Sequence, residues 1–236
     1  MISVVIPAHN EADYLPYSLR SVLIAMQQIE PACELIVVDD ASTDETSRIA
    51  AESGAKVVTV DLRQIGAVRN AGARAATGDL LVFLDADTRL PTQTLAAAWQ
   101  AHQRGCVGGG CAVDFDTPVP LAARSMLRLW NTLSRTFRWA AGSFLFVRRD
   151  AFERIGGFDE RFYAAEEIVL SERLKGQGPF TILSNTVTTS ARKLESHSLS
   201  EHLRVAIVSG LTLGRSLQRR QGLDLWYKPT RVEGKS

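Results

Sequence analysis

Runs of apolar residues alternate with amphipathic stretches through the first half of the chain. Residues 2–6, 35–38, 56–60 and 81–84 are rich in apolar side chains and have the length of strands. After the first run, apolar residues occupy positions 15, 19, 22, 26 and 29, which is the spacing of one helix face. Strand and helix patterns then follow in the order β-α-β-α-β-α-β. This order predicts an α/β fold with a doubly wound, mostly parallel sheet flanked by helices.

Local signals predict where two of these helices begin or end. Ser42 and Glu45 have the spacing of a capping box, and Gly54 is placed to close the helix that follows. The alanine-rich stretch 67–77 predicts another helix, with Gly78 as its C-terminal cap. That helix leads into the apolar run 81–84.

The second half is less regular. Residues 121–137 predict a helix that places Met126, Trp130, Leu133 and Phe137 on one face. We expect a strand at 143–147, a turn at 156–159, a helix at 166–175 and an amphipathic helix at about 199–217. For the helices at 121–137 and 199–217, core packing with a solvated basic face is favoured over contact with a membrane surface.

Composition narrows the class of protein. The chain has 236 residues, 45% hydrophobic and 22% charged, with a formal net charge of +1, which argues against a general nucleic-acid binder. Its three cysteines form neither a CxxC pair nor an even disulfide framework, which favours a reducing compartment. Neither a signal peptide nor a run of 18 apolar residues is visible, so we expect a cytoplasmic protein, with peripheral contact at the inner face of the membrane as the alternative.

Acidic residues follow two of the predicted strands. Asp85 and Asp87 come directly after the run 81–84, and Asp39-Asp40 ends the run 35–38. In doubly wound sheets ligands bind beyond the carboxyl ends of the strands. Two carboxylates one residue apart can hold Mg2+ or Mn2+, which prefer oxygen ligands and leave room for phosphate. The pattern indicates a metal-bound diphosphate, and the alternative is a polar turn that ends a strand.

Four motifs in order resemble the family 2 glycosyltransferases with the GT-A fold. They are Ile-Pro-Ala-His-Asn-Glu from position 6, Val-Val-Asp-Asp-Ala-Ser-Thr-Asp from 37, Arg-Asn-Ala-Gly-Ala-Arg-Ala-Ala-Thr-Gly-Asp from 69 and Phe-Leu-Asp-Ala-Asp-Thr from 83. The resemblance implies a single GT-A domain over residues 1–236. Within it, 1–90 would bind a nucleotide sugar, 91–220 would form the helical acceptor side, and 221–236 would be a polar tail.

The resemblance also assigns roles to residues. Asp40 would contact the base or ribose, Arg69 would face the diphosphate or organise Asp85, and Asp87 would ligate the metal. His197 could complete the metal shell, and Arg192 with Lys193 could close over the diphosphate. The nucleotide-sugar site would comprise Pro7, Ala8, Asn10, Glu11, Asp40, Arg69, Asp85, Ala86 and Arg192.

An inverting transferase also needs a general base for the acceptor hydroxyl. The resemblance places it at Glu166-Glu167, which opens a predicted helix, and Glu166 is slightly favoured because it is nearer the loop. The alternative is that both carboxylates only stabilise the start of that helix. The expected partners are a donor linked to UDP or GDP and an unidentified hydroxyl acceptor.

Two other functions remain open at this point. Glu-Glu departs from the commoner Glu-Asp or Asp-Asp pair, so a nucleotide-sugar-binding or scaffold protein without catalysis is one alternative. A haloacid-dehalogenase-type phosphotransferase is a weaker one, because Arg89 stands where that family has Thr or Val. A sugar nucleotidyltransferase is disfavoured, because residues 7–11 lack a glycine-rich basic loop.

Overall fold

The computed structural model of the protein describes residues 1–192. The predicted helix at 199–217, the tail at 221–236, Lys193 and His197 therefore lie outside the described residues. In chain order the elements are β1 (Ile2–Ala8), α1 (Leu15–Gln27), β2 (Cys33–Asp40), α2 (Thr46–Glu52), β3 (Lys56–Val60), α3 (Ile65–Ala75), β4 (Leu80–Leu84), β5 (Thr88–Arg89), α4 (Thr92–Gln103), β6 (Gly108–Phe115), α5 (Leu121–Phe137), β7 (Phe144–Arg148), α6 (Arg149–Arg154), α7 (Glu166–Lys175) and β8 (Phe180–Thr189).

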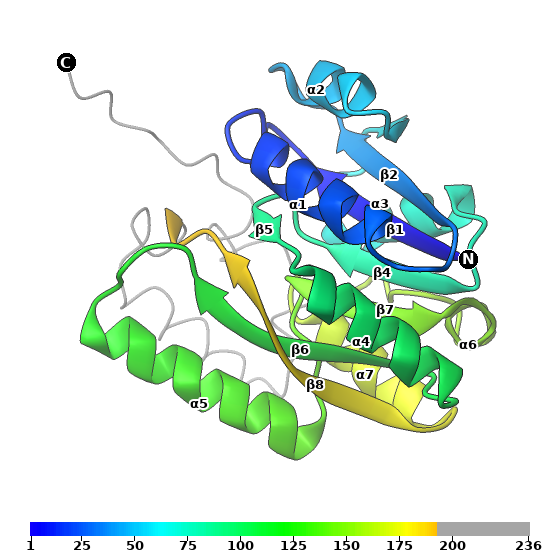
Figure 1. Cartoon of the computed structure of the whole chain (residues 1–236), viewed down its shortest axis with the longest axis vertical. Coiled ribbons are helices and arrows are strands. Elements are labelled where there is room, and N and C mark those ends of the chain that lie inside the picture. Colours follow the sequence, from blue (N-terminus) through cyan, green and yellow to red (C-terminus); the bar gives the residue numbers. More distant parts are fainter. Residues whose placement is uncertain (193–236) are drawn as a thin grey trace.

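The strands form one sheet in the order β3-β2-β1-β4-β7-β6-β8-β5 (Figure 1). β3, β2, β1 and β4 pair in parallel, as the alternating pattern of the first half predicts. β7 runs antiparallel between β4 and β6, β8 is parallel to β6, and β5 is antiparallel to β8. The predicted doubly wound α/β fold is confirmed, and the second half adds antiparallel pairs to it.

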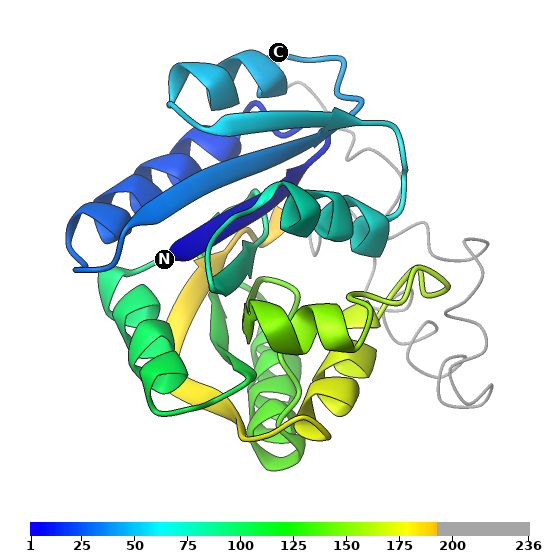
Figure 2. The same cartoon turned by 90° about the vertical axis from the view of Figure 1, so that its right-hand side faces the viewer.

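Helices cover both faces of the sheet. Successive residues of β1 point to opposite sides, so Val4 and Ile6 pack in the cluster that includes α1 and α4. Val5 packs instead in the cluster that includes α3, α6 and α7. Figure 2 shows these two helical layers on either side of the sheet. The side chains of β1 and β4 are all buried, which explains why β4 is an unbroken apolar run and β1 is apolar except for Ser3.

The predicted capping box before α2 is wrong. α2 begins at Thr46, and the side chain of its N-cap residue Glu45 makes no cap hydrogen bond. The Thr46 N–H donates to Asp44 Oδ1 at 3.0 Å. The Ser42 hydroxyl instead accepts the backbone N–H of Asn10 at 2.9 Å, so it holds the loop after β1. Gly54 does follow the end of α2, with a φ of +79° that favours glycine.

Gly78 is likewise not the cap of α3. That helix ends one residue before Ala76, whose backbone is extended. Gly78 is needed for another reason: a Cβ at this position would lie 2.7 Å from Ser3 Oγ and 2.8 Å from the Met1 carbonyl oxygen. The glycine lets the chain pass close beside β1 before β4 begins.

α5 has the predicted boundaries, but a different side of it faces the core. Its buried residues are Ala123 and Ser134, whereas Met126 and Phe137 of the predicted apolar face are exposed. The Asn131 side chain fixes this rotation, because it accepts the N–H of Val113 at 3.1 Å and donates to the carbonyl of Val113 at 2.9 Å. The expected core packing is therefore confirmed for Trp130, which packs partly buried against the core, and wrong for Met126 and Phe137.

Among the helices of residues 1–192, none combines the length and apolar character needed to cross a bilayer.

Candidate active site

The polar residues that follow β1, β2 and β4 meet at one edge of the sheet. Ala8 pairs with Asp39 in the parallel register of β1 and β2, and β4 lies on the other side of β1. Parallel strands end at the same edge, and that edge is where doubly wound folds bind ligands. The start of α7 and the end of β8 reach the same edge, as the contacts of Glu166 and Arg192 show.

The loops after β1 and β2 hold each other in place. Asn10 has a φ of 54°, and its Oδ1 accepts the backbone N–H of Thr43 at 2.8 Å. The buried Asp40 carboxylate accepts the N–H groups of Leu62 at 2.7 Å and Arg63 at 2.9 Å. The residues predicted to contact the nucleoside therefore lie on loops that hydrogen bonds hold in place. Asp40 also fixes the segment between β3 and α3.

Glu11, Asp87 and Arg192 converge from three distant parts of the chain. Arg192 Nη2 forms an ion pair with Glu11 Oε1 and lies 3.2 Å from Asp87 Oδ2. The Arg192 guanidinium stacks over the ring of Tyr14 at 4.4 Å from its centroid. The Thr189 hydroxyl donates to Asp87 Oδ1 at 3.2 Å. The structure thus brings together two carboxylates that were predicted for the donor site, and both contact the Arg192 guanidinium.

Arg69 joins the end of β4 to the start of α7. Its side chain is 3% exposed, with Nη2 at 2.8 Å from Asp85 Oδ1 and Nη1 at 2.5 Å from Glu166 Oε1. Nη2 also donates to the Gly142 carbonyl at 3.2 Å. The two carboxylates raise the pKa of the buried guanidinium, which stays charged. The ion pair puts Arg69 in contact with Asp85, and its role in organising the donor site stays a prediction.

Asn70, next in sequence, fixes the turn that leads toward α7. Its amide donates to the Phe158 carbonyl and accepts the Phe158 N–H, both at 2.9 Å. The turn needs glycine at position 157, where φ is +74° and a Cβ would lie 2.6 Å from Asn70 Oδ1. Sequence reasoning assigned no role to Asn70, although it lies within the quoted motif.

Glu166 and Glu167 have different environments at the start of α7. Glu166 is buried and pairs with Arg69. Burial and, after it, the neighbouring Glu166 carboxylate raise the pKa of Glu167 to about 8, and the Arg69 charge only partly offsets them. The two groups share a hydrogen bond, so near neutral pH the pair retains a proton.

The donor set around Asp87 fits a hard divalent cation. Glu11 and Asp87 offer carboxylate oxygens at one point, which Arg192 neutralises. Within residues 1–192 no group of three or more His, Cys, Asp or Glu residues is arranged to hold a metal by itself. Such a site suits Mg2+ or Mn2+, which bind through one or two carboxylates together with substrate phosphates.

Two residues at this edge were not predicted from the sequence as site residues. Arg63 Nη1 lies 2.6 Å from His9 Nε2, beside the predicted nucleoside site. Tyr14 carries the stacked guanidinium of Arg192. Arg63 has the positive φ of 50° that marks a constrained loop residue, but no local sequence pattern signals it.

Residues 3–156 match the sequence profile of glycosyl transferase family 2. The undecaprenyl-phosphate 4-deoxy-4-formamido-L-arabinose transferase of Sodalis glossinidius is 38% identical over 102 residues, which cover 40% of this chain and 31% of that relative. The chain thus matches about a third of that relative's length.

Solved structures share the fold. The mannosyltransferase PcManGT from Pyrobaculum calidifontis, in complex with GDP-Man and Mn2+, superimposes with a TM-score of 0.65 at 20% identity, over 95% of this chain and 71% of that one. TarS 1-349 of S. aureus in complex with UDP-GlcNAc gives 0.64 at 20% identity, over 95% and 69%. Since the family profile covers more than half of the sequence, this chain belongs to glycosyl transferase family 2.

Proposed function

We propose that the protein transfers a sugar from a nucleoside-diphosphate sugar to a hydroxyl acceptor, with inversion, using Mn2+ or Mg2+ at the diphosphate. The observation that carries this proposal is the convergence of Glu11, Asp87 and Arg192 next to the group of Arg69, Asp85 and Glu166. One group offers oxygens and a cation for a metal-bound diphosphate. The other holds carboxylates near the sugar and the acceptor.

The donor would lie along the carboxyl edge of β1, β2 and β4. Pro7, Ala8, Asn10 and Asp40 would line the nucleoside, with Asp85 and Ala86 nearer the sugar. The related structures named above contain GDP-Man or UDP-GlcNAc, which supports a donor of either base.

Asp87 would hold the metal together with the diphosphate oxygens. When bound there, the metal would neutralise charge on the departing nucleoside diphosphate. Arg192 is placed to move from Asp87 to that same charge, because both of its present partners are the carboxylates of this site. His197 remains a predicted further ligand outside the described residues.

Glu167 suits the role of general base better than Glu166. The Glu166 carboxylate is held by Arg69, so it is less free to reach an acceptor hydroxyl. Glu167 has a pKa raised to about 8, and a base is most effective when its pKa lies near the working pH. Glu166 and Arg69 would then position α7, and Glu167 would accept the proton of the acceptor hydroxyl.

A thermal-shift screen of UDP, GDP, dTDP and CDP tests the donor site, each with Mn2+, Mg2+ or EDTA. A ligand at about a hundred times its Kd stabilises the folded state by roughly 2.7 kcal/mol, which is a measurable shift. We expect one nucleotide to stabilise the wild type only with metal, and Asp87→Asn to lose that response. Glu172→Gln, an exposed acid of α7 away from the edge, is the matched control.

Two results would contradict the proposal. One is a wild type that responds to no nucleotide with any metal. The other is an Asp87→Asn variant that responds as fully as the wild type. Inversion is checked separately, by NMR assignment of the anomeric configuration of the product against that of the donor.

A further inference from the structure

α5 exposes an unusual share of the large apolar side chains of the molecule. Eight such side chains are exposed in residues 1–192, and half of them lie on this helix. Leu121 is 76% exposed, Leu129 58%, Phe137 48% and Met126 42%. Only Ala123 and Ser134 of the helix are buried. Because apolar side chains gain by leaving water, a helix with this surface is suited to contact with another apolar phase.

The same helix is basic and contains no acid. Arg124, Arg128 and Arg135 are exposed, and residues 121–137 include neither Asp nor Glu. Residues four and eleven positions apart in a helix lie within about 40° of one another, so the three arginines share one flank. In the described part of the chain, no carboxylate forms a salt bridge with any of them. The flank therefore complements a negatively charged surface.

We propose that α5 is the surface through which the protein docks on an anionic lipid bilayer. Helices that lie in a membrane interface combine exposed Leu, Phe and similar residues with a basic flank, and anionic lipids attract each basic residue near the surface. The charge of the helix selects the bilayer over a neutral apolar partner. The Asn131 contacts that hold α5 on β6 fix this surface outward.

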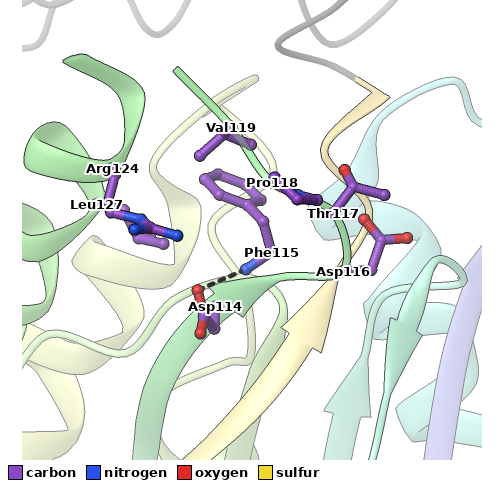
Figure 3. A pocket seen from close by; sticks show the side chains of 8 residues that line it. All are labelled: Asp114, Phe115, Asp116, Thr117, Pro118, Val119, Arg124 and Leu127. Atoms are coloured by element: carbon purple, nitrogen blue, oxygen red, sulfur yellow. Dashed lines mark hydrogen bonds between the residues drawn. The ribbon is translucent and has the colours of Figure 1, made fainter. Parts of the chain in front are cut away.

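A pocket of about 240 Å³ connects the helix to the active-site edge (Figure 3). Arg124 and Leu127 reach into it from α5, opposite Phe115 and Val119. Asp116, on the side toward β8, donates its N–H to the Thr189 carbonyl at 3.0 Å and accepts the N–H of Ala191 at 3.1 Å.

This pocket lies between the proposed bilayer-binding surface of α5 and Asp87, the proposed metal ligand. Thr189 donates from its hydroxyl to Asp87, so a single residue separates the pocket from the donor site. Resting on the proposed function, the acceptor would be a lipid-borne hydroxyl whose anionic head reaches this pocket while its chain stays in the bilayer. Arg124 would face the anionic group of that head.

Vesicle cosedimentation tests the docking surface, with the full chain and without donor or metal. The vesicles are phosphatidylcholine alone or mixed with phosphatidylglycerol. We expect binding to the anionic vesicles only, weakened by salt. A triple Arg124→Gln, Arg128→Gln, Arg135→Gln variant should bind on the order of a hundredfold more weakly. The double variant Leu121→Ser, Leu129→Ser should bind the anionic vesicles roughly tenfold more weakly, because two apolar contacts are removed.

Matched controls carry the same chemical changes elsewhere. Arg20→Gln, Arg74→Gln and Arg104→Gln remove three exposed arginines, and Ile24→Ser with Leu62→Ser removes two exposed apolar side chains. Thermal melting of every variant confirms folding. The controls should bind as the wild type does.

Three outcomes would overturn the proposal. They are no binding of the wild type to anionic vesicles, equal losses in the α5 and control variants, and light scattering that shows self-association of the wild type abolished by the α5 changes without any vesicle binding. Nucleotide binding is measured separately. A failed docking surface with intact metal-dependent nucleotide binding would leave the proposed function standing.

Discussion

Two arginine-centred groups meet at the active-site edge, and they differ in how deeply they lie. Arg69 joins Asp85 to Glu166 and is 3% exposed, whereas Arg192 joins Glu11 to Asp87 and is 15% exposed. Arg69 is enclosed by α3, α7 and the Phe158 ring, 5.4 Å from its guanidinium carbon. Arg192 belongs to the segment that follows β8.

The difference in exposure between Arg69 and Arg192 indicates that the two arginine–carboxylate groups have different roles. Arg69 pairs with the buried Glu166 carboxylate and cannot leave without stranding that charge, so Arg69 is part of the framework. A pair at the edge can be replaced by other ions, so Arg192 can give up Asp87 to a metal. We expect the donor to rearrange the second group and leave the first in place.

Removing the buried cation should have the largest effect on stability. Arg69→Met should lower the free energy of unfolding by about 3–5 kcal/mol, because the Glu166 and Asp85 carboxylates lose their partner in a poorly hydrated site. Urea unfolding followed by circular dichroism measures this. Arg192→Met is the matched change at the edge, with an expected cost of about 1–2 kcal/mol. Equal costs for the two variants would remove the distinction between the groups.

The proton on the Glu166–Glu167 pair should make stability depend on pH. The pKa of Glu167 is raised from 4.5 to about 8, so the folded state holds this proton more tightly than the unfolded chain. The benefit is present in full below pH 4.5 and is lost as the pH rises to about 8.

Glu167→Gln should abolish that decline and be more stable than the wild type at pH 9 by a few kcal/mol. Urea unfolding at pH 5, 7 and 9 measures it. Glu172→Gln should keep the wild-type slope in this range, because hydrogen bonds from Lys175 and Trp139 lower the pKa of Glu172. If the free energies of unfolding of Glu167→Gln and the wild type change with pH in parallel, the shared proton is not on this pair.

The smallest expected effect is a change in Mn2+ affinity when Arg192 is replaced. Arg192→Gln removes the charge that competes for Asp87, so Mn2+ alone should bind about three- to tenfold more tightly, while the nucleoside diphosphate with Mn2+ should bind more weakly. Electron paramagnetic resonance of free Mn2+ measures the first quantity and calorimetry the second. Arg63→Gln, at the nucleoside side of the edge, should leave Mn2+ binding unchanged. Weaker binding of Mn2+ alone in Arg192→Gln would show that Arg192 does not compete with the metal.

The sequence predicts the first half of the fold well because its central strands are buried and therefore rich in apolar residues. β1, β2 and β4, with the acids that end β2 and follow β4, can be recognised locally, and the edge strand β3 is recognised by its valines although it is only partly buried. β8 was not predicted, because only Phe180, Leu183 and Val187 are buried, without strict alternation, and much of the rest is Thr and Ser. The rotation of α5 depends on one Asn131 contact to β6, which no helical pattern contains.

The composition of the candidate site was predictable, but its pairing was not. Family motifs indicate Glu11, Asp85, Asp87 and Glu166 one by one. Arg192 meets Glu11 across 181 positions, and Arg69 meets Glu166 across 97. Such contacts depend on the order of strands in the sheet, which brings the end of β8 beside β5 and Asp87. For the same reason, the choice between Glu166 and Glu167 as base required the position of Arg69.

The most direct test of this account is a crystal soaked with Mn2+ and the nucleoside diphosphate identified by the thermal-shift screen. Anomalous scattering at the manganese edge locates the metal without reference to the protein. We predict one peak beside the Asp87 carboxylate and the diphosphate, Arg192 moved away from Asp87, and Arg69 still paired with Asp85 and Glu166. A manganese site away from Asp87, or Arg192 still on Asp87 with nucleotide bound, would contradict the account.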